Sequence, residues 1–175
     1  HTDLTEQQHR FANAAHNSGE ALLTLINDIL DFSKIEASKV ELERDDFDLV
    51  ELLDEICYLQ GEPAQKRGLS LNNICDASVP AKLVGDPAKI RQVVMNLVGN
   101  AIKFTHNGDV NVRVSSKSTP SRNRHVLVHI TVEDTGIGMD EDTQEKVFDA
   151  FTQADTSTTR EYGGTGLGLA FSRQY

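Results

Sequence analysis

The sequence predicts an α+β fold, a two-layer α/β sandwich with a mixed sheet covered by helices on one face and preceded by a long helix. Residues 47–60 and 87–104 have the apolar spacing of amphipathic helices. Apolar residues recur at every second position in 110–114 and 126–132, as expected for strands with one buried face. Proline is absent before Pro63, so the first part of the chain is free to form an extended helix.

The first helix is predicted to begin at Thr5, which has the spacing of a capping box with Gln8. Apolar or small residues then alternate in steps of four and three, as in a coiled-coil seam: Phe11, Ala15, Ser18, Leu22, Leu25, Ile29 and Phe32. Other apolar residues widen this stripe toward that of a four-helix bundle: Leu23, Ile26, Leu30 and Ile35. A helix of about thirty residues would measure ~45 Å, at about 1.5 Å per residue. We expect a homodimer through this helix; the alternative is an amphipathic helix packed on its own domain.

The remaining elements follow in order. The helix at 47–60 is punctuated by Pro63 and Gly68, and residues 69–74 alternate loosely like a strand. Residues 82–84 are a possible short strand. Asp86 is predicted to cap the helix that runs to about residue 104, with proline at its first position. The polar stretch 115–124 is predicted to be the loop of a hairpin between two antiparallel strands.

Charge and composition exclude several classes of partner. The 17 basic and 27 acidic residues give a net charge of -10, which argues against nucleic acid and against an anionic membrane surface. Cys57 and Cys75 form no CxxC pair, so packing thiols are favoured and a disulfide between them stays open. No apolar run approaches the ~18 residues that span a bilayer. We expect a cytoplasmic segment without membrane contact.

One polar helix face carries candidate ligands. Asn96 and Asn100 are one helical turn apart, and Lys103 follows on the same side. An amide oxygen can bind a hard cation such as Mg²⁺, and a lysine can bind phosphate as a point charge. The alternative for such a face is simple solvation.

Two glycine-rich turns are the other candidates. Asp134 ends a predicted strand, and Gly136 and Gly138 behind it allow a ligand to approach the backbone, although a plain turn has the same composition. Residues 163–170 place four glycines before an apolar helical segment, a pattern that suits phosphate binding. The spacing is neither a Walker A loop nor a dinucleotide fingerprint, and a flexible linker is the alternative. Between the turns, residues 152–162 form either a mobile lid or a surface loop.

Taken together and in this order, these motifs resemble those of sensor histidine kinases. Residues 96–105 resemble the N box, 134–138 the first glycine box, 148–151 the F box and 164–169 the second glycine box. Residues 26–37 resemble the second dimerisation helix of these kinases, especially the hybrid type. The resemblance covers nearly the whole chain and implies a Bergerat-type ATP-binding sandwich.

The resemblance also implies a role for each matching residue. Asn100 would bind Mg²⁺ with support from Asn96, Lys103 would contact phosphate, and Arg160 in the lid would reach the terminal phosphate of ATP. Asp134 would accept the adenine amino group. The nucleotide would otherwise be lined by Phe104, Gly136, Gly138, Phe148, Phe151, Gly164, Thr165, Gly166, Leu167 and Gly168.

Position 96 separates the relatives of this fold. The chaperone, gyrase and mismatch-repair ATPases resemble one another in a glutamate that activates water four residues before the Mg-binding asparagine. Here that position is Asn96, and an amide accepts no proton at neutral pH. The substitution favours phosphoryl transfer over hydrolysis and argues against a hydrolytic ATPase.

The family's phosphorylated histidine has no match. It is followed by Glu or Asp and then Thr-Pro, whereas the six histidines here, of which His16 is the nearest candidate, lack that context. We expect 1–44 to be the second dimerisation helix with the first helix absent, and 45–175 to be an ATP-binding domain without its C-terminal end. We expect the chain as printed to bind ATP weakly and not to phosphorylate itself.

The resemblance implies a protein-histidine kinase that uses ATP and Mg²⁺ and transfers the γ-phosphoryl group to a histidine outside this segment. It implies a homodimer, a response-regulator receiver domain as partner, and the cytosolic part of a membrane-anchored sensor. A degenerate nucleotide-sensing dimerisation module without kinase activity is the alternative.

Overall fold

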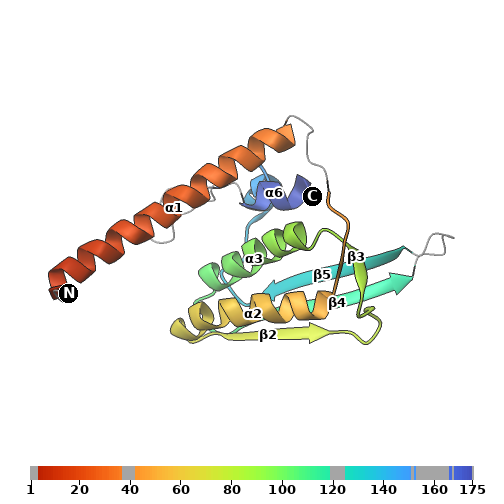
Figure 1. Ribbon diagram of the computed structural model, residues 1–175. Coiled ribbons are helices and arrows are strands. Elements are labelled where there is room, and N and C mark those ends of the chain that lie inside the picture. Colours follow the sequence, from red (N-terminus) through yellow and green to blue (C-terminus); the bar gives the residue numbers. More distant parts are fainter. Residues whose placement is uncertain are drawn as a thin grey trace. The chain divides into compact units, whose positions relative to one another are not determined.

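The computed structural model describes residues 4–36, 42–118, 125–150, 152, 166 and 168–174 (Figure 1). The chain divides into two compact units, His1–Val40 and Glu41–Tyr175, and each is described by itself. Among the described helices, none combines the length and the apolarity that crossing a bilayer requires.

The first unit is the helix α1 (Glu6–Glu36). Its predicted capping box is confirmed: the Thr5 amide donates to Gln8 Oε1 at 2.9 Å, and the Gln8 amide donates to Thr5 Oγ1 at 3.3 Å. Six large apolar side chains of the predicted stripe are 44–66% exposed: Phe11, Leu22, Leu23, Ile26, Ile29 and Leu30. The side chains of Leu25, Phe32 and Ile35 lie outside the described part. The stripe therefore remains a helix face whose predicted partner is a second copy of the chain.

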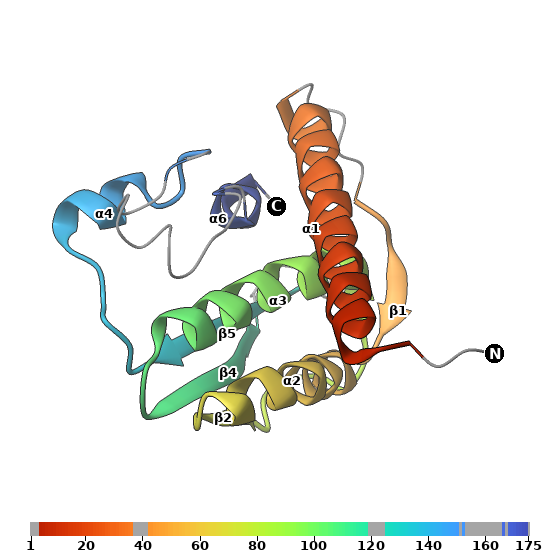
Figure 2. The ribbon, with the colours of Figure 1, turned by 90° about the vertical axis from the view of Figure 1, so that its left-hand side faces the viewer.

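The second unit is built on a mixed sheet, as predicted. Its strand order is β2 (Ser70–Cys75), β4 (Asp109–Ser118) and β5 (Val126–Asp134), with β2 parallel and β5 antiparallel to β4. The short strands β1 (Asp45–Phe47) and β3 (Leu83–Gly85) form a separate two-stranded antiparallel sheet. Helices α2 and α3 pack beside each other on one face of the three-stranded sheet (Figure 2).

Helix α2 (Leu49–Lys66) differs from the prediction at both ends. Phe47 belongs to β1, and Asp48 caps the helix by accepting from the amides of Val50 and Glu51. The helix continues through Pro63, although proline has no amide to donate to the helix, and the buried Ala64 packs the last turn against the core. It ends where Gly68 adopts a φ of +72°.

Helix α3 (Pro87–Phe104) has the predicted bounds and the predicted cap. The buried Asp86 carboxylate accepts from the amide of Lys89 at 2.9 Å and from that of Glu43 at 3.1 Å. The core lies between α2, α3 and the sheet, where burial of each large apolar side chain contributes about 1.5–3 kcal/mol. Its fully buried apolar members are Leu49, Leu53, Ile56, Val94, Val98, Val110 and Val112.

The C-terminal part of the unit holds two short helices. These are α4 (Glu141–Lys146) and α6 (Gly168–Gln174), and α6 lies against α3. The hairpin loop was predicted to begin at residue 115, which is too early, because β4 continues to Ser118 and pairs there with Val126. The rest of that loop lies outside the described residues.

Candidate functional site

The polar face of α3 forms the centre of the candidate site. Asn96, Asn100 and Lys103 are all half-buried, as side chains on a covered helix face are expected to be. Asn100 Nδ2 donates to Asn96 Oδ1 at 3.4 Å, and Asn96 Nδ2 donates to Ser172 Oγ in α6 at 3.3 Å. Both hydrogen bonds are long, so they are weak and easily exchanged for bonds to a ligand.

Helix α6 meets this face at its first residue. A Cβ on Gly168 would stand 2.0 Å from Asn96 Oδ1, so at position 168 no side chain fits between α6 and α3. Ser172 donates through Oγ to Gly168 O at 3.1 Å, which holds the serine that meets Asn96. Gly166, two residues before the start of α6, has a φ of +68°, a conformation that favours glycine.

The C-terminal end of α3 carries the positive charges of the site. Lys103 Nζ lies 4.7 Å from the ring centroid of Phe104. Partial burial, and after it the nearby Arg67 guanidinium, lower the pKa of the Lys103 ammonium. Arg67 Nη1 donates to the carbonyl oxygens of Ile102 at 3.1 Å and Lys103 at 2.8 Å. An ammonium that has lost part of its water shell gains more from a phosphate partner than a fully solvated one.

The first glycine motif is attached to the same end of α3. Asp134 Oδ1 accepts from the Gly136 amide at 2.8 Å, and the Ile137 amide donates to Phe104 O at 3.3 Å. A Cβ on Gly136 would stand 2.5 Å from that carbonyl oxygen, so this position needs a glycine. Gly138 follows with a φ of +68°.

The structure thus brings residues of both predicted glycine motifs into contact with α3. Asn96 links α3 to Gly168, and Phe104 links it to the turn after Asp134. Phe148 follows α4 with its side chain 40% exposed. The remaining predicted site residues lie outside the described part of the chain, and their roles stay predictions: Phe151, Arg160, Gly164, Thr165 and Leu167.

Three residues of this site were missed from the sequence. Ser172 stands one helical turn after Gly168, which was a usable signal, because that spacing puts both on one face of α6. Thr135 lies inside the glycine motif but was given no role. Arg67 follows α2 and carries no motif; only the packing of α2 beside α3 brings it to the carbonyls of Ile102 and Lys103.

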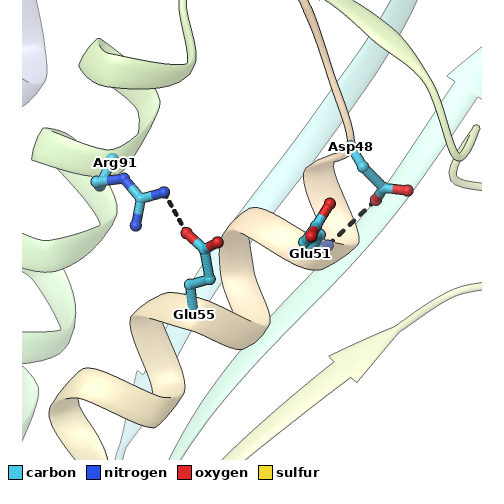
Figure 3. A network of polar contacts seen from close by, with 4 residues as sticks. All are labelled: Asp48, Glu51, Glu55 and Arg91. Atoms are coloured by element: carbon cyan, nitrogen blue, oxygen red, sulfur yellow. Dashed lines mark hydrogen bonds and ion pairs between the residues drawn. The ribbon is translucent and has the colours of Figure 1, made fainter.

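A second polar region has no part in this site. It lines a hollow of about 630 Å³ between β1, the first half of α2 and the start of α3. Figure 3 shows its contacts: Asp48 Oδ1 caps α2 at the Glu51 amide, and Arg91 pairs with Glu55 across the two helices. The side chains of that pair are 38% and 52% exposed, so it contributes about 0–1 kcal/mol. The polar side chains of this region are therefore explained by a helix cap and a surface ion pair.

Comparison with known proteins gives the chain a family. Residues 85–175, more than half of its length, match the model described as "Histidine kinase-, DNA gyrase B-, and HSP90-like ATPase". The signal transduction histidine-protein kinase BarA of Escherichia coli is 42% identical over 173 residues, which cover 99% of this chain and 19% of BarA. Hybrid signal transduction histidine kinase B of Dictyostelium discoideum is 40% identical over 99% of this chain and 9% of its own length.

Solved structures agree with this assignment. Full-length ShkA in complex with AMPPNP superposes with a TM-score of 0.79 at 31% identity, covering 99% of this chain and 34% of ShkA. The catalytic domain of the histidine kinase ThkA has a TM-score of 0.58 at 30% identity over 75% of this chain and 78% of that domain. The chain spans about a fifth or less of the length of the two kinases BarA and hybrid kinase B. The matched residues contain α3, the turn after Asp134 and α6, and the chain therefore belongs to the histidine kinase-, DNA gyrase B- and HSP90-like ATPase family.

Proposed function

We propose that this chain is the ATP-binding catalytic part of a sensor histidine kinase, which transfers the γ-phosphoryl group of ATP to a histidine outside this segment. One observation carries the proposal. Asn96, which is hydrogen-bonded to Asn100 on α3, also donates to Ser172 of α6 and lies against Gly168. At the end of the same helix, the Phe104 carbonyl accepts from the Ile137 amide in the turn after Asp134. A single helix face then lies between a base-binding turn and a phosphate-binding turn.

The two ends of the nucleotide would bind to different groups. Asp134 offers a carboxylate beside a glycine turn, which suits the exocyclic amino group of adenine. Lys103 offers a partly buried ammonium to the phosphates, with Phe104 beside it. The glycines at 164, 166 and 168 would let the phosphate chain approach the backbone. Arg160, Phe148 and Phe151 would complete the site from the segment between the two motifs.

Asn100 suits a magnesium ion that accompanies the nucleotide. Its Nδ2 is the atom that donates to Asn96, which leaves the carbonyl oxygen Oδ1 as the atom for a hard cation. Within the described residues, no group of three or more His, Cys, Asp or Glu side chains could hold a metal ion. The phosphate oxygens and water would supply other ligands, as is usual for Mg²⁺ in phosphoryl-transfer enzymes. Mg²⁺ would neutralise charge that develops on the phosphates.

Asn96 favours transfer over hydrolysis. Its amide donates to Ser172 and accepts from Asn100, and an amide does not take a proton from water at neutral pH. Catalysis would consist of positioning and charge stabilisation, so the phosphoryl group stays on ATP until a histidine acceptor arrives. This argues against a hydrolytic ATPase with the same fold.

The relatives support the wider setting of this proposal. BarA is named a signal transduction histidine-protein kinase, and ThkA has been solved in complex with the response regulator TrrA. We propose a response-regulator receiver domain as partner, a homodimer through the exposed stripe of α1, and a cytoplasmic location. Residues 1–44 would be part of the dimerisation domain and residues 45–175 the catalytic domain.

A transfer assay tests the function. The chain is incubated with γ-labelled ATP, Mg²⁺ and a separately produced acceptor domain that carries a phosphorylatable histidine. Acid-labile label on the acceptor is the expected result, and fast release of free phosphate would contradict it. Nucleotide binding without transfer to any competent acceptor would favour the alternative, a nucleotide-sensing dimerisation module.

A further inference from the structure

We propose that Thr135 is a positioning residue that sets the preference of this site for adenine over guanine. It would do so by holding the turn that follows Asp134, without contacting the base. The inference rests on the proposed function, because it concerns how the same site selects its nucleotide.

The Thr135 hydroxyl is used in both directions. Oγ1 donates to the carbonyl oxygen of Asn107 at 3.2 Å and accepts from the amide of Asp109 at 3.1 Å. The backbone amide of Thr135 also donates to Asp109 O at 3.3 Å. Three hydrogen bonds thus tie the residue after Asp134 to the end of the turn that follows α3 and to the first residue of β4.

Gly108 shows how closely these two segments approach. A Cβ at this position would stand 2.2 Å from Thr135 Oγ1, and the glycine has a φ of +115°. The connecting turn therefore bends around the hydroxyl, with no room for a side chain between them. Such a fit is specific to threonine or serine, because valine has the shape of threonine but neither accepts from Asp109 nor donates to Asn107.

The Thr135 hydroxyl fixes the backbone that follows Asp134, and other contacts fix Asp134 itself. Asp134 is in register with Val110 at the end of the ladder, and its Oδ1 accepts from the Gly136 amide at 2.8 Å. One carboxylate oxygen is thus held by the turn, and the direction of the other follows from where the turn is fixed. Thr135 is the side chain that fixes it.

The direction of that carboxylate decides which purine is accepted. Adenine presents an amino donor at the position where guanine presents a carbonyl acceptor. A carboxylate aimed at this position attracts the first and repels the second, whereas a carboxylate free to turn away discriminates little. Loss of the Thr135 hydroxyl should therefore reduce the preference for adenine more than it reduces binding of the phosphates.

The test compares variants of the whole 175-residue chain. Dissociation constants for ATP, GTP and inorganic triphosphate are measured with Mg²⁺ by calorimetry for wild type, Thr135→Val, Thr135→Ser and the control Thr131→Val. Thr131 is an exposed residue of β5, the strand that ends just before Thr135, and it lies opposite Arg113. We expect Thr135→Val to weaken ATP about fivefold to tenfold, the size of a lost hydrogen bond, with GTP and triphosphate nearly unchanged. Serine should restore the ATP:GTP ratio, and Thr131→Val should behave as wild type.

The outcomes separate this inference from the proposed function. An equal loss for all three ligands in Thr135→Val assigns the residue a purely structural role and overturns the inference, as does an unchanged ATP:GTP ratio. A wild-type chain without affinity for ATP overturns the proposed function, and the inference with it. If Thr135→Val does not fold, Thr135→Ser and Thr135→Ala, which differ only in the hydroxyl, are compared instead. An equal ATP:GTP ratio in that pair overturns the inference.

Discussion

The amide oxygen of Asn96 occupies the space that a side chain at position 168 would need. A Cβ on Gly168 would stand 2.0 Å from Asn96 Oδ1, far inside any permitted contact. Asn96 on α3 and Gly168 at the start of α6 are thus in direct contact, although they lie far apart in the sequence.

Gly168→Ala should weaken nucleotide binding. The new methyl group forces Asn96 out of its position, and Asn96 is hydrogen-bonded to both Ser172 and Asn100. We expect the dissociation constant for ATP, measured by calorimetry, to rise about tenfold or more, equivalent to about 1.4 kcal/mol. Gly61→Ala in α2 is the control, because its Cβ would meet nothing within 4 Å. That control should raise the free energy of unfolding by about 0.5–1 kcal/mol and leave the affinity alone. Wild-type affinity in Gly168→Ala would contradict the prediction.

Asn100→Ala should remove the dependence of ATP binding on magnesium. In wild type we expect ATP to bind more tightly with Mg²⁺ than with a chelator, because the Asn100 oxygen binds the cation together with the phosphates. The variant should bind ATP with the same weak affinity in both conditions. Asn111→Ala is a matched control, since Asn111 lies in β4 and bonds to Asn72 on the sheet. A magnesium effect that survives in Asn100→Ala would assign the metal to other ligands.

ATP affinity should fall at alkaline pH because of Lys103. Burial and the Arg67 charge lower the pKa of this ammonium, so in the free chain it gives up its proton below the ordinary lysine value of about 10.4. The attraction to phosphate is complete below the lowered pKa and is lost as the pH rises through it. Phosphate groups are already ionised above about pH 6, so they do not titrate in this range. Lys103→Arg should bind ATP with a flatter pH profile, and identical profiles for both chains would contradict this assignment.

Arg67 should stabilise the second unit more than its neighbour Lys66 does. Its guanidinium donates to the last carbonyls of α3, where the helix dipole favours a cation. We expect Arg67→Met to lower the free energy of unfolding in urea by about 1–2 kcal/mol. Lys66→Met removes an exposed pair with Glu62, whose side chains are 73% and 74% exposed, and should leave the free energy of unfolding nearly unchanged. Equal effects of the two substitutions would refute the role of Arg67.

The exposed stripe of α1 should mediate dimerisation. Leu22 belongs to the predicted seam and is 57% exposed, so we expect Leu22→Asp to place an unpaired charge in the dimer interface and convert the chain to a monomer. Light scattering at high protein concentration measures the change. Asn13→Asp adds the same charge at an exposed residue outside the seam and should leave a dimer. A wild-type chain that is monomeric under these conditions would show that the stripe has another partner.

Prediction from the sequence was most successful where a signal is local. The capping box at Thr5, the cap at Asp86 and the alternation in β4 and β5 were all confirmed, because each depends on neighbours within one turn or strand. The predicted end of α2 was wrong, because Pro63 was interpreted as a residue that ends the helix. The helix continues past that residue, and the buried Ala64 beside it packs against the core.

The sequence by itself determined the layers, the order of elements and the residue types of the site. Apolar spacing sets which face of a helix or strand is buried, and motif order is a property of the chain alone. Only the tertiary structure decided which motifs touch: Asn96 with Gly168, Phe104 with the turn after Asp134, and Arg67 with the end of α3. The physical reason is that these contacts depend on how α2, α3, α6 and β5 pack. Thr135 illustrates it, because the hydrogen-bond partners of its hydroxyl are Asn107, before β4, and Asp109, the first residue of β4.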